Sequence, residues 1–306
     1  MKLNIEVGGL SLQNPTILAA GILGTTGASL KRVASLGAGA VVTKSIGLEP
    51  KPGHHNPSLI KLDCGYLNAM GLPNPAYKEF ARELEVARDG GVPVIASVFG
   101  AGEAEFAEVA AGLPEAAAYE LNVSCPHAKG YGMQVGTDPA LVKSITSAVK
   151  KAVKAPVWVK LTPNVTDITV IGKAAQEGGA DAVVAVNTLK AMAIDINSGY
   201  PILGNASGGL SGPAVKPVAV KCVYDLSGAL DIPVIGAGGV STWADAVEFL
   251  MAGASAVEIG SAVYDDIGVF ASVSMGLSDY LDRKGMQLKD LVGLSHRVVK
   301  HEADKC

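Results

Sequence analysis

Eight short apolar runs recur along the chain, separated by segments with helical periodicity. Each run is almost continuously apolar and does not alternate, which is typical of parallel strands that are covered on both faces. The runs are TILAAG (16–21), AVVTKS (40–45), PVIASVFG (93–100), YELNVSC (119–125), VWVKLT (157–162), AVVAVNT (182–188), PVIGAGG (233–239) and AVEIGSA (256–262).

The segments between these runs predict amphipathic helices. In residues 138–152, Asp138 is a candidate N-cap and Pro139 is suited to the first helical position, ahead of an apolar stripe. Eight strand–helix units in 306 residues predict a single α/β domain over residues 1–306, a (β/α)8 TIM barrel. The alternating start, MKLNIEVGGLSLQNP, predicts a β-hairpin that closes the bottom of the barrel. An open doubly wound sheet has less support, because no G-x-G-x-x-G or G-x-x-x-x-G-K sequence is present.

Composition and charge narrow the class of protein. The net charge is −4 and no run of Lys and Arg occurs, so we expect no nucleic-acid partner. No apolar run approaches the roughly 18–20 residues of a membrane span, so we expect no membrane anchor. The four cysteines are far apart and form no C-x-x-C pair, which argues against a metal or iron–sulfur site in this chain. We therefore expect a cytoplasmic protein with reduced thiols.

Polar residues mark the carboxyl ends of the predicted strands. In a (β/α)8 barrel these ends surround the active site. One strand-terminal lysine can equally extend to solvent, but a full ring of polar ends around one mouth favours a ligand site. The polar candidates are Lys44, Ser45, Ser97, Asn122, Cys125, Lys160, Asn187 and Thr188.

Glycines end the last two strands, at Gly238 and Gly239 and again at Gly260 before Ser261. Their backbone amides can approach a phosphate closely, although ordinary turns of this fold also use glycine. Flavin mononucleotide (FMN) would fit such a cradle. Lys160 would then stabilise the negative charge of the reduced ring. A Schiff-base lyase using Lys160 or Lys44 is an alternative that residue chemistry alone leaves open.

Cys125 is a candidate base. A thiol with a reference pKa near ~8.5 can be activated close to neutral pH, and the surrounding Gly-rich loop would let it close over a substrate. An inert buried cysteine is the more common case at an arbitrary position. The polar residues around Cys125 favour the functional interpretation.

The stretch LNVSCPHAKGYG (121–132) resembles the catalytic loop of the FMN-dependent dihydroorotate dehydrogenases. The resemblance covers almost the whole chain and is greatest to class 1B, the catalytic subunit of a two-subunit enzyme. The dihydropyrimidine dehydrogenases, a sister family, share SCPH and are the alternative. Other matching stretches are TKSIGLEPKPGHHNP, LNAMGLPNP, VKLTPNVTDI, VNTLKAMAIDI and GGLSGPAVKP.

This resemblance implies oxidation of dihydroorotate to orotate in pyrimidine biosynthesis. Cys125 would take the proton from C5, and hydride from C6 would reach flavin N5. The implied substrate contacts are Lys44, Asn68, Ala69, Met70, Gly71, Leu72, Asn122, Asn187 and Thr188. The implied FMN contacts are Ala20, Lys44, Ser45, Ser97, Asn122, Lys160, Val186, Gly212, Gly238, Gly239, Gly260 and Ser261.

The resemblance also implies partners for the chain. A separate subunit would carry FAD and an iron–sulfur cluster and would pass electrons to NAD. Two copies of this chain would form a homodimer at the centre of a heterotetramer. Two positions, Ala20 and Ser97, depart from the residues common in the family, so we expect a backbone contact at the first and a weaker polar contact at the second.

Overall fold

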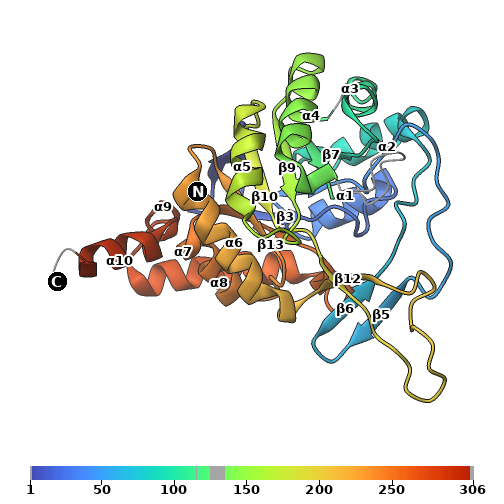
Figure 1. Cartoon of the computed structure of the whole chain (residues 1–306). Coiled ribbons are helices and arrows are strands. Elements are labelled where there is room, and N and C mark those ends of the chain that lie inside the picture. The colour runs from blue at the N-terminus through green and yellow to red at the C-terminus, as the bar shows by residue number, and fades with distance from the viewer. Residues whose placement is uncertain (1, 115, 125–134, 304–306) are drawn as a thin grey trace.

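A computed structural model describes residues 2–114, 116–124 and 135–303. Within these residues, eight parallel strands form a closed barrel with helices around it (Figure 1). This confirms the predicted (β/α)8 fold. Each predicted run overlaps one strand, and every strand ends before its run does, because the last residues leave the ladder to form the mouth. The strands are β3 (Thr16–Leu18), β4 (Ala40–Val42), β7 (Val94–Val98), β8 (Ala118–Asn122), β9 (Val157–Leu161), β10 (Ala182–Ala185), β13 (Val234–Ala237) and β14 (Ala254–Ile259).

The helices follow the strands and cover the outside of the barrel (Figure 1). Asp138 caps α4 as predicted, because its Oδ1 accepts from Ala140 N at 2.9 Å and Pro139 occupies the first turn. No helix in the described ranges is long and apolar enough to cross a bilayer. The helices are α1 (Gly27–Ser35), α2 (Tyr77–Arg88), α3 (Glu103–Ala111), α4 (Pro139–Ala152), α5 (Ile168–Glu177), α6 (Lys216–Ala229), α7 (Trp243–Ala252), α8 (Val269–Lys284), α9 (Leu288–Leu291) and α10 (Leu294–Ala303).

Side chains along each barrel strand alternate between two cores. On β9, Val157 and Val159 pack outward against the helices, whereas Trp158 belongs to the apolar core inside the barrel. Lys160 is two residues beyond Trp158 and therefore also faces the interior, one layer nearer the carboxyl ends. The alternation of side chains along the strands thus gives the barrel interior an apolar layer near the N-terminal end and a polar layer nearer the carboxyl ends.

The N-terminal hairpin seals the apolar layer. Strands β1 (Ile5–Val7) and β2 (Leu10–Leu12) pair antiparallel, and Val7, Leu10 and Leu12 join the same interior cluster as Trp158. The indole Nε1 of Trp158 donates a hydrogen bond of 2.8 Å to Gly8 O in the turn. The prediction of a hairpin that closes the N-terminal end of the barrel is therefore confirmed.

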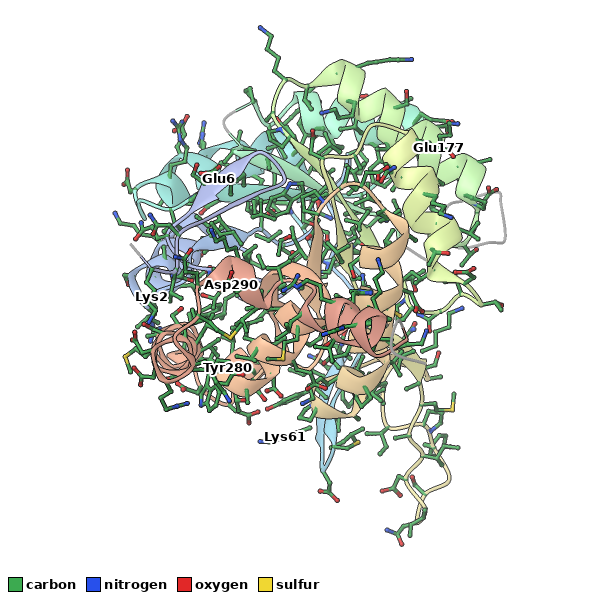
Figure 2. The ribbon with its side chains drawn as sticks, turned by 90° about the vertical axis from the view of Figure 1, so that its left-hand side faces the viewer. Lys2, Glu6, Lys61, Glu177, Tyr280 and Asp290 are labelled. Carbon is green, nitrogen blue, oxygen red and sulfur yellow. The ribbon has the colours of Figure 1, made fainter. Side chains whose placement is uncertain are left out.

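A second sheet, which the sequence did not predict, extends from the barrel at the lower right of Figure 1. Its antiparallel order is β11-β12-β6-β5, so two distant stretches of the chain are paired. Figure 2 shows Lys61, on β5, well apart from Glu6 on the hairpin, so the two added sheets occupy different regions of the molecule. The strands are β5 (Leu59–Leu62), β6 (Gly65–Asn68), β11 (Leu189–Ala191) and β12 (Gly208–Ser211).

The buried indole of Trp158 gives a test of this packing. We expect Trp158→Ala to lower the free energy of unfolding by about 3–5 kcal/mol, because it leaves a cavity and unpairs Gly8 O. Urea denaturation measures this loss. Tyr200→Ala, at a side chain that is 75% exposed, is the control and should change stability by less than about 0.5 kcal/mol. Equal losses in the two variants would contradict the assignment.

Candidate active site

A cavity of about 650 Å³ opens at the carboxyl ends of the barrel strands. Its walls come from the barrel loops and from the second sheet, which contributes Tyr66, Asn68 and Gly209. This volume lies in the middle of the range of cofactor and small-molecule sites. The barrel therefore provides the floor and the unpredicted sheet provides one side.

The structure brings nearly all of the predicted site residues to this cavity. Ser97 is an exception: it is fully buried and reaches the cavity only through Ser45, whose Oγ lies 2.9 Å from its own. Cys125 lies outside the described residues, whereas the preceding Ser124 lines the cavity. The predicted residues that line it are Ala20, Lys44, Ser45, Asn68, Ala69, Met70, Gly71, Leu72, Asn122, Lys160, Val186, Asn187, Thr188, Gly212, Gly238, Gly239, Gly260 and Ser261.

A hydrogen-bonded chain of amides and hydroxyls crosses the cavity wall. Asn122 Nδ2 donates to Ser45 Oγ at 2.9 Å, and Asn187 Nδ2 donates to Asn122 Oδ1 at 3.4 Å. Asn164, which sequence reasoning missed, donates from Nδ2 to Thr188 O at 3.0 Å. These bonds fix the orientation of the amides before any ligand arrives, which lowers the entropic cost of binding.

Lys44 lines the cavity, and its side-chain nitrogen is only partly hydrogen-bonded. It is only 6% exposed, and its Nζ donates to Gly21 O at 3.0 Å. Burial lowers the pKa of Lys44, because the charged form loses hydration. An anionic group bound beside it would offset that cost. Lys44 is therefore suited to hold a carboxylate or phosphate.

Lys160 is held between two buried carboxyl groups. Its Nζ lies 2.5 Å from Glu258 Oε2 and 3.7 Å from Glu120 Oε1. Burial alone would lower the pKa of Lys160, but the charges of Glu120 and Glu258 outweigh it and raise the pKa. The raised pKa favours the ammonium form of Lys160, which disfavours a Schiff base at this residue, since that chemistry needs a neutral amine.

Sequence reasoning missed both of these carboxyl groups. Each is a glutamate inside an otherwise apolar strand, in YELN (119–122) and VEIG (257–260), which is a signal the sequence does carry. A third carboxylate, Asp265, which the sequence suggested as a helix cap, lies at the rim. Its Oδ1 accepts from Tyr66 OH at 2.8 Å and from Lys61 Nζ at 2.5 Å, which ties the second sheet to the loop after β14.

A glycine cradle lines part of the cavity. Gly238 and Gly239 have φ of 118° and 84°, in the region that favours glycine. A Cβ at Gly239 would lie 2.8 Å from Gly212 O, so no larger residue fits without displacement of the backbone. Without side chains, Gly238 and Gly239 also leave their backbone amides uncovered, which is a general feature of anion-binding loops.

The sequence and structure of the chain were compared with those of known proteins. A family model described as dihydroorotate dehydrogenase matches residues 2–281. The chain belongs to the dihydroorotate dehydrogenase family. It is 78% identical over 98% of its length to the whole "Dihydroorotate dehydrogenase B (NAD(+)), catalytic subunit" of Methanocella arvoryzae. It is 67% identical to the protein with the same name in Methanosarcina acetivorans, over 95% of each chain.

The fold of the family is also found among solved structures. A crystal structure of DHODH from Eimeria tenella, in complex with ferulenol, superposes with a TM-score of 0.84. The match covers 97% of this chain and 89% of the other at 24% identity, so it supports the barrel alone. In this dihydroorotate dehydrogenase family member, no group of three or more metal-ligating side chains gathers among the described residues.

Gly239 provides a test of the cradle. We expect Gly239→Ala to lower the free energy of unfolding by about 1–3 kcal/mol more than Gly91→Ala does. Both glycines have positive φ, but a Cβ at Gly91 would meet nothing within 4 Å, so this control isolates the clash with Gly212. Chemical denaturation of the two variants measures the difference, and equal losses would show that the cradle is not tightly packed.

Proposed function

We propose that this chain oxidises dihydroorotate to orotate on FMN, as the class 1B catalytic subunit of an NAD-linked enzyme of pyrimidine biosynthesis. The names of its relatives at 78% and 67% identity support the reaction. The observation that supports the proposal most is a single cavity with three features. It contains the ammonium group of Lys160, the glycine cradle and a set of amide side chains with fixed orientation.

The residues present fit FMN. A cavity of about 650 Å³ accommodates a three-ring system together with a small substrate. Gly238, Gly239, Gly260 and Ser261 would surround the phosphate, and Lys160 would lie at the ring. FMN, when bound, supplies the hydride acceptor. Lys160 contributes a fixed positive charge where negative charge develops, without reorganisation of solvent.

The substrate would be held by side chains of matching chemistry. Asn68, Asn122 and Asn187 each offer both a donor and an acceptor, as the imide edge of a pyrimidine ring requires. Lys44 would bind the substrate carboxylate by a charge-assisted hydrogen bond, since it is buried and, among the described residues, bonded only to Gly21 O. Thr188 lies beside Asn187 on the same wall.

Removal of hydrogen from the saturated C–C bond needs a base as well as a hydride acceptor. We assign that role to Cys125, which would take the C5 proton while hydride leaves C6. Cys125 lies outside the described residues; Ser124, which precedes it, lines the cavity. Because Cys125 follows Ser124 in the sequence, it would act as the base in a site where Lys44 and the asparagine side chains already hold the substrate ring.

The relatives' names, "catalytic subunit" of an NAD(+) enzyme, support a second subunit that passes electrons onward. We propose that this partner carries FAD and an iron–sulfur cluster and delivers electrons to NAD. The assembly would be a heterotetramer around a homodimer of this chain.

The proposed reaction is tested on the purified protein under anaerobic conditions. We expect a yellow protein whose flavin absorbance bleaches on addition of dihydroorotate. Dihydrouracil is the comparison, because it lacks the carboxylate for which Lys44 is placed, and should bleach the flavin far more slowly. Faster bleaching by dihydrouracil would favour the dihydropyrimidine dehydrogenases, and a colourless protein trapped by borohydride would favour a Schiff-base lyase.

Cys125→Ala tests the base. We expect the variant to keep its flavin while the rate of reduction by dihydroorotate falls by roughly 10²–10⁴-fold, the usual contribution of a general base. Stopped-flow absorbance measures this rate. Cys64→Ala, at an exposed cysteine that does not line the cavity, is the matched control and should reduce at the rate of the unmodified protein. Near-normal reduction in Cys125→Ala would remove Cys125 from the role.

A further inference from the structure

Glu120, Lys160 and Glu258 form a buried cluster in the middle of the barrel, and the proposed reaction assigns a role only to the lysine. The exposed fractions of Glu120 and Glu258 are 0% and 1%. Lys160 and Glu258 line the cavity, whereas Glu120 lies behind them. Two carboxylates and one ammonium would give the cluster a net charge of −1, which is costly in a dry interior.

The hydrogen bonds of the cluster also disfavour two ionised carboxylates. An ionised carboxylate only accepts, and with both groups ionised Glu258 Oε1 and both oxygens of Glu120 have no donor within the described part of the chain. A proton on Glu120 converts one of its oxygens into a donor toward Glu258. One added proton thus removes the excess charge and pairs atoms that are otherwise unsatisfied.

The surroundings of Glu120 agree with a protonated carboxyl. Burial, and then the charge of Glu258, raise the pKa of Glu120 well above its ordinary value of 4.5, against the opposing charge of Lys160. The charged groups beside Glu120 are Glu258, on β14, and Lys160, on β9. On β7, the residue paired with Glu120 is the uncharged Ser97.

We propose that Glu120 and Glu258 share one proton, so that the cluster is neutral as a whole, and that Glu258 is the positioning residue that aims Lys160 at the cavity. Glu258 fixes the ammonium through its 2.5 Å contact, and Glu120 supports Glu258 from behind. This inference rests on the proposed function, in which Lys160 faces a bound flavin. The neutral cluster sets how strongly positive the cavity floor is and therefore sets the reduction potential of that flavin.

The shared proton is tested without any cofactor. A proton held only in the folded state adds stability below pH 4.5, and this stability is lost as pH rises through the raised pKa of Glu120. Glu120→Gln keeps the shape of the protonated acid and cannot ionise. We therefore expect the stability of the unmodified protein, relative to Glu120→Gln, to fall in urea denaturation as the pH rises above 4.5 and through the raised pKa of Glu120.

Glu177→Gln is the control for this profile. Glu177 lies on the protein surface (Figure 2), and a hydrogen bond and ion pair with Lys143 lower its pKa. Its contribution therefore has the opposite sign: it is present above pH 4.5 and is lost as pH falls through the lowered pKa. A stability difference for Glu120→Gln that does not change with pH would overturn the shared proton.

The role of the cluster toward the flavin is tested by spectroscopic titration of the reduction potential. Glu120→Gln preserves a neutral cluster, so we expect less than a twofold change in the ratio of reduced to oxidised flavin at fixed potential. The double variant E120Q/E258Q leaves Lys160 without an anionic partner. We expect that ratio to rise at least tenfold, which is a positive shift of roughly 30 mV for a two-electron couple.

The outcomes separate this inference from the proposed function. If both carboxylates were ionised, Glu120→Gln would remove one negative charge and the double variant two, so a shift in Glu120→Gln of about half that in the double variant would show that they were. No shift in the double variant at acidic as well as neutral pH, so that loss of the proton from the buried Lys160 is not the cause, would show that the cluster does not act on the flavin. Either result overturns the inference even though the unmodified protein is yellow and bleaches with dihydroorotate. A colourless unmodified protein would instead refute the proposed function, while the pH profile of unfolding still decides the shared proton.

Discussion

Alternation of side chains around a closed barrel is the constraint on which the rest of this molecule depends. Every second residue of each parallel strand must fit inside a space that only side chains can fill. The lower interior meets this demand with apolar residues around Trp158, and the hairpin seals it. The upper interior instead holds Lys160, Glu120 and Glu258. Because buried charges are tolerated only in compensated groups, the lysine is accompanied by its carboxyl partners.

The polar layer lowers stability in exchange for a prepared site. Among the described residues, the buried Lys44 Nζ donates to a single backbone carbonyl and one oxygen of the Glu258 carboxyl has no donor. Hydrophobic side chains of similar size would stabilise the barrel more. In return, the site holds these polar groups in fixed positions where charge must be stabilised. Enzymes commonly give up some folding stability for such a site.

The barrel could be predicted from sequence because its strands are continuously apolar, a pattern that few other structures share. The second sheet could not, since β5 and β12 are largely half-exposed and β12 begins with two glycines. Candidate residues at strand ends were found by position, but the Asn68–Leu72 segment was found only through family resemblance. The pairing of Lys160 with Glu258, 98 residues away, appears only when the barrel closes. The position of Ser97 behind Ser45 could not be predicted either, because the end of a strand does not tell which of two hydroxyl groups faces the cavity.

The second sheet has a consequence for how the protein is made. Asn68 of β6 pairs with Gly209 of β12, and these residues are 141 positions apart. At a synthesis rate of ~5–20 residues per second, the ribosome needs roughly ten seconds to supply the missing partner. During that interval, β6 lacks its partner strand β12, and the apolar cluster around Leu67 lacks Ala191, Ala193 and Leu203, which pack against it later. Nascent chains of this protein are therefore exposed to chaperones at the very segment that later walls the cavity.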